Sequence, residues 1–519
     1  MPKKSIAKNY VFNVLYQIFI LFTPLITTPY LSRILKPEGI GQYSFTASLA
    51  FYFTLFASLG FGLYAQREIA NHQGDKAAQT RIFYEILLLR FCSTAISTLI
   101  SCSLAWAGVY QNYTNLMWLW LIQIAASEVD ITFFFQGNEE FGKIVLRNIL
   151  VKTLTIVLVF TLIKDASQVW IYVLLMTGST FLGNLSLWLY LPKYLAKVAL
   201  KDLHPWHHFI PTFKLFIPTI ATSLYTLLDK TLIGLLITDT YTAQETVIVN
   251  GVSVVQETTK RYADLENGYY EQAGKIVTMA LTIITSLGTV MIPRNSQEFS
   301  SGHLEQVKKN VYFATNFVWI LGIPLMLGIA AIAPNIIPWF LGPGYEKCVL
   351  LMQLFSPLVL LIGLSNVFGL QYLIPTKQDK KYTIGILSGA VTNLILNFVL
   401  IHYYWSLGAV IATLCAELMV SLVMALLVRK EIDWKAVFLP SWKCWIAGLL
   451  MFGSVYATAY FLAPSWSHSL LLILEGIAIY IILIFLLRDF FALTSLKKVL
   501  GWFHAKKKND SAEGSTPHE

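Results

Sequence analysis

Charged residues are scarce in this chain: they make up 13% of its 519 residues, whereas hydrophobic residues make up 56%. A soluble globular domain carries roughly 25% charged residues. The mean hydropathy of +0.61 therefore argues against a soluble enzyme or binding module and indicates lipid as the solvent for much of the chain. No basic stripe with interleaved aromatic residues lies outside the apolar stretches, so the net charge of +9 does not predict a nucleic-acid partner.

Several motifs that carry chemistry are also missing. The chain has no phosphate-binding G-x-x-x-x-G-K-[ST] loop and no H-E-x-x-H zinc motif, and its five cysteines form no C-x-x-C pair. His204, His207 and His208 form one local cluster, but no acidic ligand follows them closely. The sequence therefore predicts neither a cofactor nor a metal site.

Long apolar runs dominate what is present. A membrane span needs about 20 mostly apolar residues. By that criterion the sequence predicts an all-α polytopic membrane protein with about fourteen spans. They lie near 8–31, 42–64, 83–107, 115–136, 145–163, 168–191, 213–237, 269–292, 312–334, 349–373, 383–403, 406–428, 443–463 and 468–488.

The basic residues orient these spans. With the N-terminus inside, six of the 38 Lys and Arg residues fall in outside segments and four within spans, which leaves 28 inside. Cytoplasmic loops carry such an excess of Lys and Arg. We expect a multi-pass membrane protein with both termini in the cytoplasm and a polar cytoplasmic tail at 491–519.

An internal repeat divides the chain. Gly41-Gln-Tyr, then Ser58-Leu-Gly and Arg67, are echoed by Gly268-Tyr-Tyr, then Ser286-Leu-Gly and Arg294, with an offset of 227 residues at the first glycine. Because six spans is an even number, two such halves insert the same way and enclose a central site. The repeat predicts an N-lobe at 1–200, a C-lobe at 201–430, and an appended helix pair at 431–490. The second half has extra residues near 241–265.

Ionisable residues within the spans are the candidate functional groups, because a charge at the bilayer centre costs at least ~2.5–3.5 kcal/mol. Glu271 and Lys275 can pair on one helix face. Arg90 and Lys152 can either line a cavity or reach the interface along their own side chains. Asp229 and Lys230 point about 100° apart on a helix and need partners elsewhere.

Several motifs resemble Wzx-type polysaccharide flippases of the multidrug/oligosaccharidyl-lipid/polysaccharide exporter superfamily. The likeness runs from the first to about the twelfth span, and only 241–265 departs from it. The segments that carry it are Tyr30–Gly39 with Gly41–Phe45, Phe133–Gly137 with Lys143 and Arg147-Asn148, Leu224–Lys230, Gly268–Ile276 with Thr285–Arg294, Leu341–Tyr345, and Asn366–Thr376.

The resemblance implies two lobes in a V around a central cavity, with undecaprenyl-diphosphate-linked oligosaccharide as cargo. Membrane lipid, and a polysaccharide polymerase with its chain-length regulator, are the other expected partners, and we expect a monomer. The predicted substrate-binding cations are Arg33, Arg67, Arg90, Lys152 and Lys230. The predicted ion-coupling or lumen acids are Asp130, Asp229 and Glu417.

Two alternatives stay open at this point. An ion-coupled drug or metabolite antiporter of the same superfamily would need an acidic ion site and no lipid substrate. A membrane-bound polysaccharide polymerase or acyltransferase would need catalytic acids or histidine in an outside loop. The long outside loop at 239–268 has five acids and no histidine.

Overall fold

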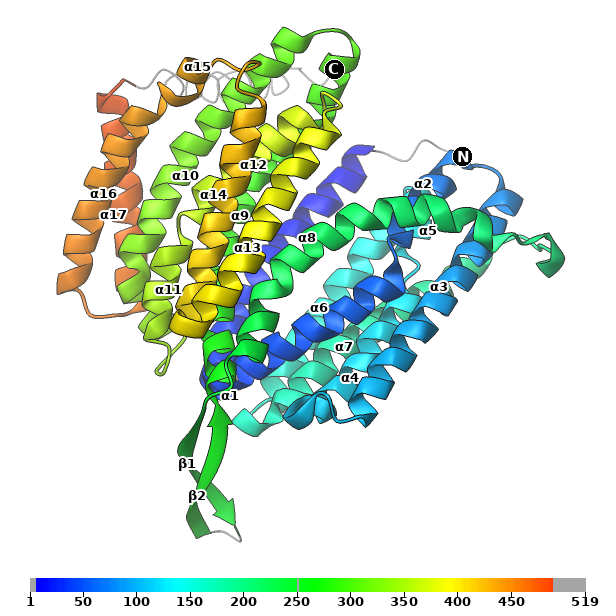
Figure 1. The fold of residues 1–519 in the computed structure, drawn as a ribbon, viewed down its shortest axis with the longest axis horizontal. Helices are drawn as coiled ribbons and strands as arrows, with labels where there is room; N and C mark the ends of the chain where they lie inside the picture. The colour runs from blue at the N-terminus through cyan, green and yellow to red at the C-terminus, as the bar shows by residue number, and fades with distance from the viewer. Residues whose placement is uncertain (1–5, 250–251, 489–519) are drawn as a thin grey trace, which may run out of the picture. The chain divides into compact units, whose positions relative to one another are not determined.

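A computed structural model of the protein describes residues 6–249 and 252–488, and the predicted tail at 491–519 lies outside them. The described chain is helical apart from one β-hairpin (Figure 1). It divides into two compact units. Unit 1 comprises Met1–Gln272, Phe340–Tyr345 and Asn393–Ala412, and unit 2 comprises Ala273–Trp339, Glu346–Thr392 and Thr413–Glu519. The units interleave along the chain, so the division into lobes at residue 200 stays a prediction.

Unit 1 contains the first eight α-helices and the hairpin. The helices are α1 (Ile6–Ser58), α2 (Phe61–Asn71), α3 (Lys76–Trp106), α4 (Thr114–Glu128), α5 (Thr132–Gly137), α6 (Phe141–Leu162), α7 (Val169–Ser186) and α8 (Phe209–Leu236). Short turns of 3-10 helix connect them: η1 (Gln111–Tyr113), η2 (Ala166–Gln168), η3 (Leu187–Leu189), η4 (Leu191–Lys193), η5 (Leu200–Asp202) and η6 (Pro205–His208).

Most of the remaining helices belong to unit 2, and α9, α10, α13 and α14 have residues in both units. They are α9 (Tyr262–Ser300), α10 (Leu304–Phe340), α11 (Lys347–Phe355), α12 (Leu358–Phe368), the π-turn η7 (Gly369–Leu373), α13 (Asp379–Tyr404), α14 (Ser406–Leu427), α15 (Trp434–Phe438), α16 (Ser441–Phe461) and α17 (Trp466–Leu486).

Each predicted span falls on a helix. Twelve helical stretches within the described ranges are long and apolar enough to cross a membrane. The first of them, Phe22–Asn71, includes a kink that separates two predicted spans, and α8 covers the predicted span at 213–237. Lys36 at the kink has φ 58° and ψ 174°, which interrupts the helix, and the following Pro37 also disfavours a helical conformation for the residue before it. The prediction of a polytopic helical membrane protein is confirmed.

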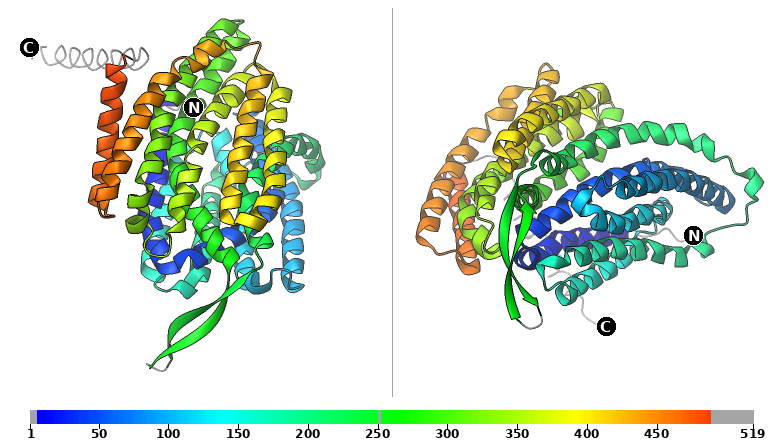
Figure 2. Two further views of the ribbon diagram at one scale, coloured as in Figure 1. Left: turned by 60° about the vertical axis from the view of Figure 1, so that its left-hand side comes forward. Right: turned by 60° about the horizontal axis from the view of Figure 1, so that its bottom comes forward.

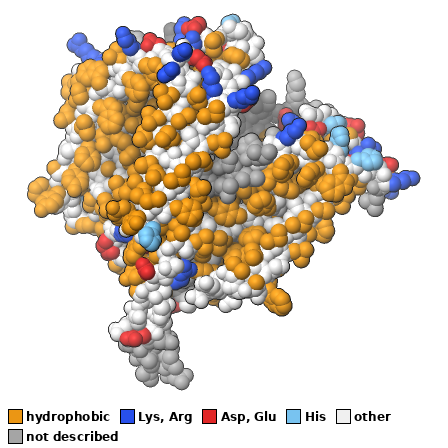
Figure 3. Space-filling model, viewed as in Figure 1, with side chains coloured by type: hydrophobic (Ala, Val, Ile, Leu, Met, Phe, Trp, Pro, Cys, Tyr) orange, Lys and Arg blue, Asp and Glu red, His pale blue; other side chains and the backbone are white. Residues whose placement is uncertain are grey.

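The surface fits a lipid environment. Leu88, Phe91, Ile96 and Leu99 recur at helical spacing on α3 with 45%, 62%, 59% and 66% of each residue exposed. Such a continuous apolar face is stable only when lipid or another protein covers it. Hydrophobic side chains also cover much of the visible helix surface, whereas the basic side chains visible on unit 2 gather at one end of its helices (Figure 3).

The hairpin was not predicted. Strands β1 (Thr240–Val249) and β2 (Val252–Arg261) pair antiparallel, from Thr240 opposite Arg261 to Val249 opposite Val252. They extend away from the helix ends of unit 1, which we call the hairpin end (Figures 1 and 2). Asn-Gly flanked by β-branched residues is the strongest short-range hairpin signal, and Asn250-Gly251 between valines fits it.

In unit 2, a cluster of hydrogen bonds connects the turn after α14 to the segment between α12 and α13 and to the start of α13. Glu431 accepts hydrogen bonds from Lys381 at 2.5 Å, Tyr372 at 2.8 Å and Gln378 at 2.9 Å. Burial by itself raises the pKa of this carboxyl, but the three donors outweigh burial, so the pKa of Glu431 lies below its ordinary value. Its stabilising contribution is therefore present above the carboxyl's unfolded pKa and is lost as pH falls through the folded one.

Close helix contact in unit 2 yields a first prediction. A Cβ on Gly389 of α13 would lie 2.2 Å from Val420 Cγ2 and 3.1 Å from the Ala416 carbonyl oxygen on α14. Gly389→Val should therefore destabilise the protein by about 1–3 kcal/mol through overpacking, measured as a lower thermal unfolding midpoint in detergent. Gly453→Val is the matched control, because a Cβ there meets nothing within 4 Å. Equal midpoints for the two variants would contradict the α13–α14 packing.

Candidate functional site

A cationic cavity lies between α6 and α7 in unit 1. It has a volume of about 180 Å³, and none of the described residues that line it is acidic. Arg147 and Lys152 supply two positive charges from the same helix. The lining is completed by neutral residues: Asn148, Val151, Thr155, Met176, Ser179, Thr180, Gly183 and Asn184.

Local packing fixes one of these cations. Arg147 donates from Nη1 to Asn184 Oδ1 at 2.8 Å, and Asn184 in turn donates to the Ala126 carbonyl at 2.9 Å. Gly183 admits the side chains of Val151 and Arg147 close to α7, since a Cβ there would lie 3.3 Å from Val151 Cγ2. Lys152 is eleven residues from the first residue of α6, or roughly 16 Å along the helix. An anionic group in this cavity would meet two cations and the amides of Asn148 and Asn184.

The hairpin end holds a second polar group, built around a crossing of α1 and α9. A Cβ on Gly41 would lie 1.7 Å from the Asp264 carbonyl oxygen, and a Cβ on Gly268 would lie 2.0 Å from the Pro37 carbonyl oxygen. The two backbones therefore touch, and only glycine fits at both positions. We call this contact the glycine crossing.

The glycine crossing is reciprocal. Gly268 is the repeat counterpart of Gly41, and Asp264 is that of Pro37, since both pairs are 227 residues apart. Gly41 contacts Asp264 and Gly268 contacts Pro37, so the two contacts are equivalent under the repeat. Ser44 donates to Glu271 at 3.0 Å, and these residues are also related by this offset. Such mutual contacts are typical of an interface around a two-fold axis. The sequence repeat thus corresponds to a contact in space.

Buried carboxylates near the glycine crossing all have partners. Glu271 pairs with Lys230 at 2.5 Å, so the two members of this pair come from α9 and α8. Asp229 accepts from Tyr270, from Asn393 at 3.1 Å and from Asn397 at 2.5 Å. The sequence-based expectation that adjacent Asp229 and Lys230 need partners on other helices is met.

Two further acids come from the loop predicted at 239–268. Asp264 accepts from Tyr113 at 2.5 Å and from Gln42 at 3.3 Å, and Glu266 accepts from the backbone and side chain of Ser406. Both carboxylates lie in the first turns of α9 rather than in a loop, and both are buried. Their geometry is that of groups that hold helices together.

The family models decide the class of this protein. The model described as "Polysaccharide biosynthesis protein" matches residues 6–299, and a second model with the same description matches 258–350. The chain belongs to the polysaccharide biosynthesis protein family. Among curated members, a protein of Escherichia coli (strain K12) named "Putative O-antigen transporter" is 24% identical over 435 residues, which is 83% of this chain and 98% of that protein.

The fold agrees with this family. The solved structure of the lipid II flippase MurJ in an inward closed conformation has a TM-score of 0.67 at 15% identity, covering 93% of this chain and 99% of that one. An inward-facing multidrug resistance MATE family transporter of the MOP superfamily has a TM-score of 0.60 at 14% identity, covering 79% and 94%. At these identities the likeness shows the fold, which is that of MOP superfamily transporters, as the sequence resemblance implied.

The predicted site residues of this family member occupy different environments. Lys152 lies in the cavity, and Lys230 is paired. Arg90 is buried, donates to the Asp130 carbonyl oxygen at 2.6 Å, and is not among the residues that line the cavity. The carboxylate of Asp130 accepts from the Thr132 N–H at 2.9 Å. This pattern suggests that Arg90 and Asp130 hold the junction of α3 with the segment after α4.

The other three are not among the residues that line the cavity. Arg33 is exposed beside the α1 kink and donates to the Pro29 carbonyl at 3.2 Å. Arg67 on α2 lies 3.6 Å from Glu68 with 60% of its side chain exposed. Glu417 is buried on α14, in the part of that helix that belongs to unit 2. Arg147 lies in the Arg147-Asn148 motif, but residues five apart point about 140° apart on a helix, so the sequence alone does not indicate that Arg147 and Lys152 line one cavity.

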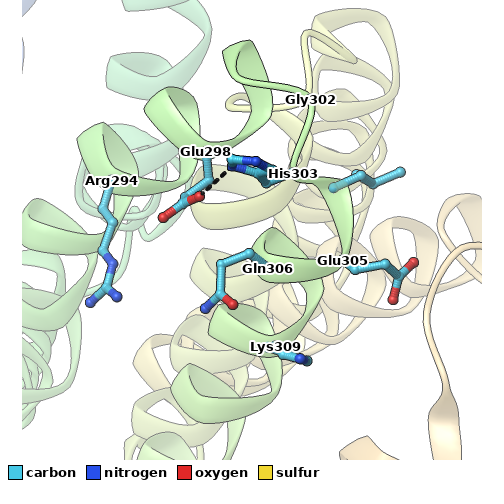
Figure 4. Close-up of a pocket in the computed structure, with 8 residues that line it drawn as sticks. Arg294, Glu298, Gly302, His303, Glu305, Gln306 and Lys309 are labelled. Atoms are coloured by element: carbon cyan, nitrogen blue, oxygen red, sulfur yellow. Dashed lines mark hydrogen bonds and ion pairs between the residues drawn. The ribbon is translucent and has the colours of Figure 1, made fainter.

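An open depression in unit 2 is less suited to binding cargo (Figure 4). It lies where α9 meets α10, and Arg294 and Lys309 line it together with Glu298 and Glu305. His303 lies 3.3 Å from Glu298. Its mixed charge and its exposure make it a feature of the polar helix ends.

The Lys230–Glu271 pair yields a second prediction. Neutralising one partner leaves the other charge partly buried without its ion-pair partner. The losses of unfolding free energy in Lys230→Gln and Glu271→Gln should therefore add up to more than the loss in the double variant. We expect a coupling energy of about 1–3 kcal/mol from a double-mutant cycle of unfolding. The control cycle uses Lys308 and Glu305, whose acid is 79% exposed. Its coupling should stay below about 0.5 kcal/mol. Equal coupling in both cycles would refute a special role for the pair.

Proposed function

We propose that this protein is a flippase that moves undecaprenyl-diphosphate-linked oligosaccharide repeat units from the cytoplasmic to the outer leaflet by alternating access. The products would supply synthesis of capsule, exopolysaccharide or O-antigen. Family membership and the transporter fold support the class, and the charge bias of the loops supports a bacterial inner membrane with both termini in the cytoplasm. A polymerase and a chain-length regulator as partners, and a monomeric state, stay predictions.

The physical barrier explains why such a cargo needs a protein. Each unpaired hydroxyl that enters hydrocarbon costs about 4–8 kcal/mol on the alkane scale. A repeat unit brings many hydroxyls, and its diphosphate brings charge. A path lined by polar groups must replace the lost hydration, while the prenyl chain stays in lipid.

The cavity between α6 and α7 is the observation that carries the proposal. An anionic diphosphate requires positive charge without competing carboxylates, and Arg147 and Lys152 provide this among neutral neighbours. The forked guanidinium of Arg147 suits phosphate oxygens, and Lys152 adds a mobile point charge. Arg33 and Arg67 are proposed to attract the cargo from the helix ends, and Lys230 becomes available only if its pair with Glu271 opens.

The structure weighs on both alternatives. An enzyme would need catalytic acids on the hairpin side. Asp264 and Glu266 are buried and hydrogen-bonded there, whereas Asp239 and Glu257 are exposed on a segment whose sequence contains no histidine. An antiporter shares the fold, since the MATE transporter matches as well. The match of the polysaccharide biosynthesis model over residues 6–299 favours the flippase.

A third prediction tests the cavity. Lys152→Gln and Arg147→Gln should each lower surface polysaccharide roughly ten-fold or more in a strain that depends on this protein, because loss of a charged hydrogen bond costs about 1.5–3 kcal/mol. Lys164→Gln is the matched control: it removes the same charge just beyond the end of α6, where Lys164 contacts the Phe160 carbonyl. Protein amounts in the membrane must be equal. If the double variant, Lys152→Gln with Arg147→Gln, exports as much polysaccharide as the wild type, the cavity has no role in the mechanism.

A fourth prediction concerns ion coupling. Asp229 is proposed as the coupling acid because Asn393 and Asn397 each donate an amide hydrogen bond to it, while their side-chain oxygens have no hydrogen-bond partner among the described residues. Asp229→Asn should make transport into vesicles independent of an imposed Na⁺ or proton gradient. Asp130→Asn and Glu417→Gln, the other predicted acids, should leave the gradient dependence in place. Retained dependence in Asp229→Asn would exclude this residue as the coupling group.

A further inference from the structure

The hairpin root joins segments that are far apart in the sequence. We define the root as Tyr241, Lys260 and Arg261, at the base of β1 and β2. Tyr241 donates to Glu38 Oε1 at 2.9 Å, and Lys260 lies 3.8 Å from the same oxygen. Glu38 follows the kink of α1, so both strands converge on one carboxylate of the first helix.

Arg261 makes the other connection. It donates to the Tyr113 hydroxyl at 3.0 Å and to the carbonyls of Gly234 and Ile237, at 2.8 and 3.3 Å, at the end of α8. A guanidinium suits this position because the last carbonyls of a helix lack partners within it. Tyr113 then donates to Asp264 of α9. One residue of the hairpin thus bridges η1, α8 and, through Tyr113, α9.

The root contacts are partly buried, which strengthens them. Lys260 and Glu38 have 23% and 20% of their side chains exposed. Burial raises the pKa of Tyr241, and the Glu38 carboxylate raises it further, so the phenol stays protonated and donates. The rings of Tyr241 and Tyr262 lie 4.8 Å apart, and Tyr262 also contacts Trp405 at 5.1 Å.

Beneath the root lies the glycine crossing, where α1 and α9 leave no room for a side chain. A cargo that leaves between these helices at the hairpin end requires their separation. An isolated two-stranded hairpin is marginally stable in water. Its root is therefore ordered by the same contacts that bind α1 to α8 and α9.

We propose that the hairpin root is a clasp that holds the glycine crossing closed and sets how often the hairpin end of the transporter opens. Release of Glu38 from Tyr241 and Lys260, and of Tyr113 from Arg261, weakens the closure, which then depends on the direct contacts that Gln42 and Tyr113 make with Asp264 of α9. The role of the clasp in transport rests on the proposed function, but the closure is a property of the protein without cargo. The projecting part of the hairpin, beyond Ala243 and Thr258, does not contribute to the closure.

The experiment measures access to the glycine crossing. Ser44→Cys places a thiol at a buried position there, in a background whose native cysteines (Cys92, Cys102, Cys348, Cys415 and Cys444) are replaced. A membrane-impermeant maleimide is added from outside to cells that hold the protein. The rate of labelling reports opening and does not depend on transport.

Root variants should open the crossing. Glu38→Gln and Arg261→Gln should each raise the labelling rate roughly ten-fold or more, as expected for loss of about one charge-assisted hydrogen bond. Glu257→Gln is the matched control, since it neutralises an exposed acid of β2 away from the root. The charge swap Glu38→Lys with Lys260→Glu should restore slow labelling, which ties the effect to this ion pair, and unchanged thermal unfolding midpoints in detergent show that the single variants fold.

A shortened hairpin separates the root from the rest. Replacing 244–257 by Asn-Gly keeps Ala243 opposite Thr258, and removing an even number of residue pairs preserves the alternation of the ladder. This variant should label as slowly as the parent. Unchanged labelling in both root variants, or fast labelling in the shortened hairpin, would overturn the clasp. Failure of transport with the labelling pattern intact would instead count against the proposed function.

Discussion

A charge inside hydrocarbon must be paired, hydrated or met by cargo, and this constraint governs the arrangement of the polar residues described here. Asp229 lies among a tyrosine and two asparagines, Glu271 pairs with Lys230, and Arg90 holds a backbone carbonyl. Lys152 differs from these, since it lines a cavity that has a second cation and no acid. That imbalance is what an anionic cargo would correct.

The glycine crossing connects the repeat in the sequence with the structure. Gly41 and Gly268 are repeat counterparts, and each lies against a backbone carbonyl of the helix that carries the other glycine. Contacts of this kind permit two backbones to approach closely and also to separate, because few side chains interlock. Polar contacts beside the crossing, from Ser44–Glu271 to Lys260–Glu38, can then determine how stable the closed arrangement is.

Sequence reasoning located the helices because a span is a local property. The amino-acid sequence alone shows the apolar runs, the Lys36-Pro37 pair at the kink and the repeat glycines. It does not show the pair of Glu271 with Lys230, since that pair depends on how α8 meets α9. The hairpin was not predicted, although Asn250-Gly251 between valines is a hairpin signal. The surrounding chain is helical, and the segment stood out only as extra residues.

The roles of individual cations depend on tertiary packing for the same reason. Arg90 and Lys152 looked equivalent as basic residues within spans, but one donates to a carbonyl and the other faces a cavity. Arg147 drew little attention in the sequence because it lies near a span end, where a basic residue is ordinary. Its contact with Asn184 of α7 turns it toward the cavity.

The most direct test of the account is translocation by the purified protein. Vesicles containing the protein and a fluorescent saccharide on a polyprenyl diphosphate would be treated with an impermeant quencher to follow movement between leaflets. The account predicts movement far faster than in protein-free vesicles, and much slower movement of the same saccharide on an uncharged polyprenyl carrier. Equal rates with and without the protein, or no preference for the diphosphate, would contradict it.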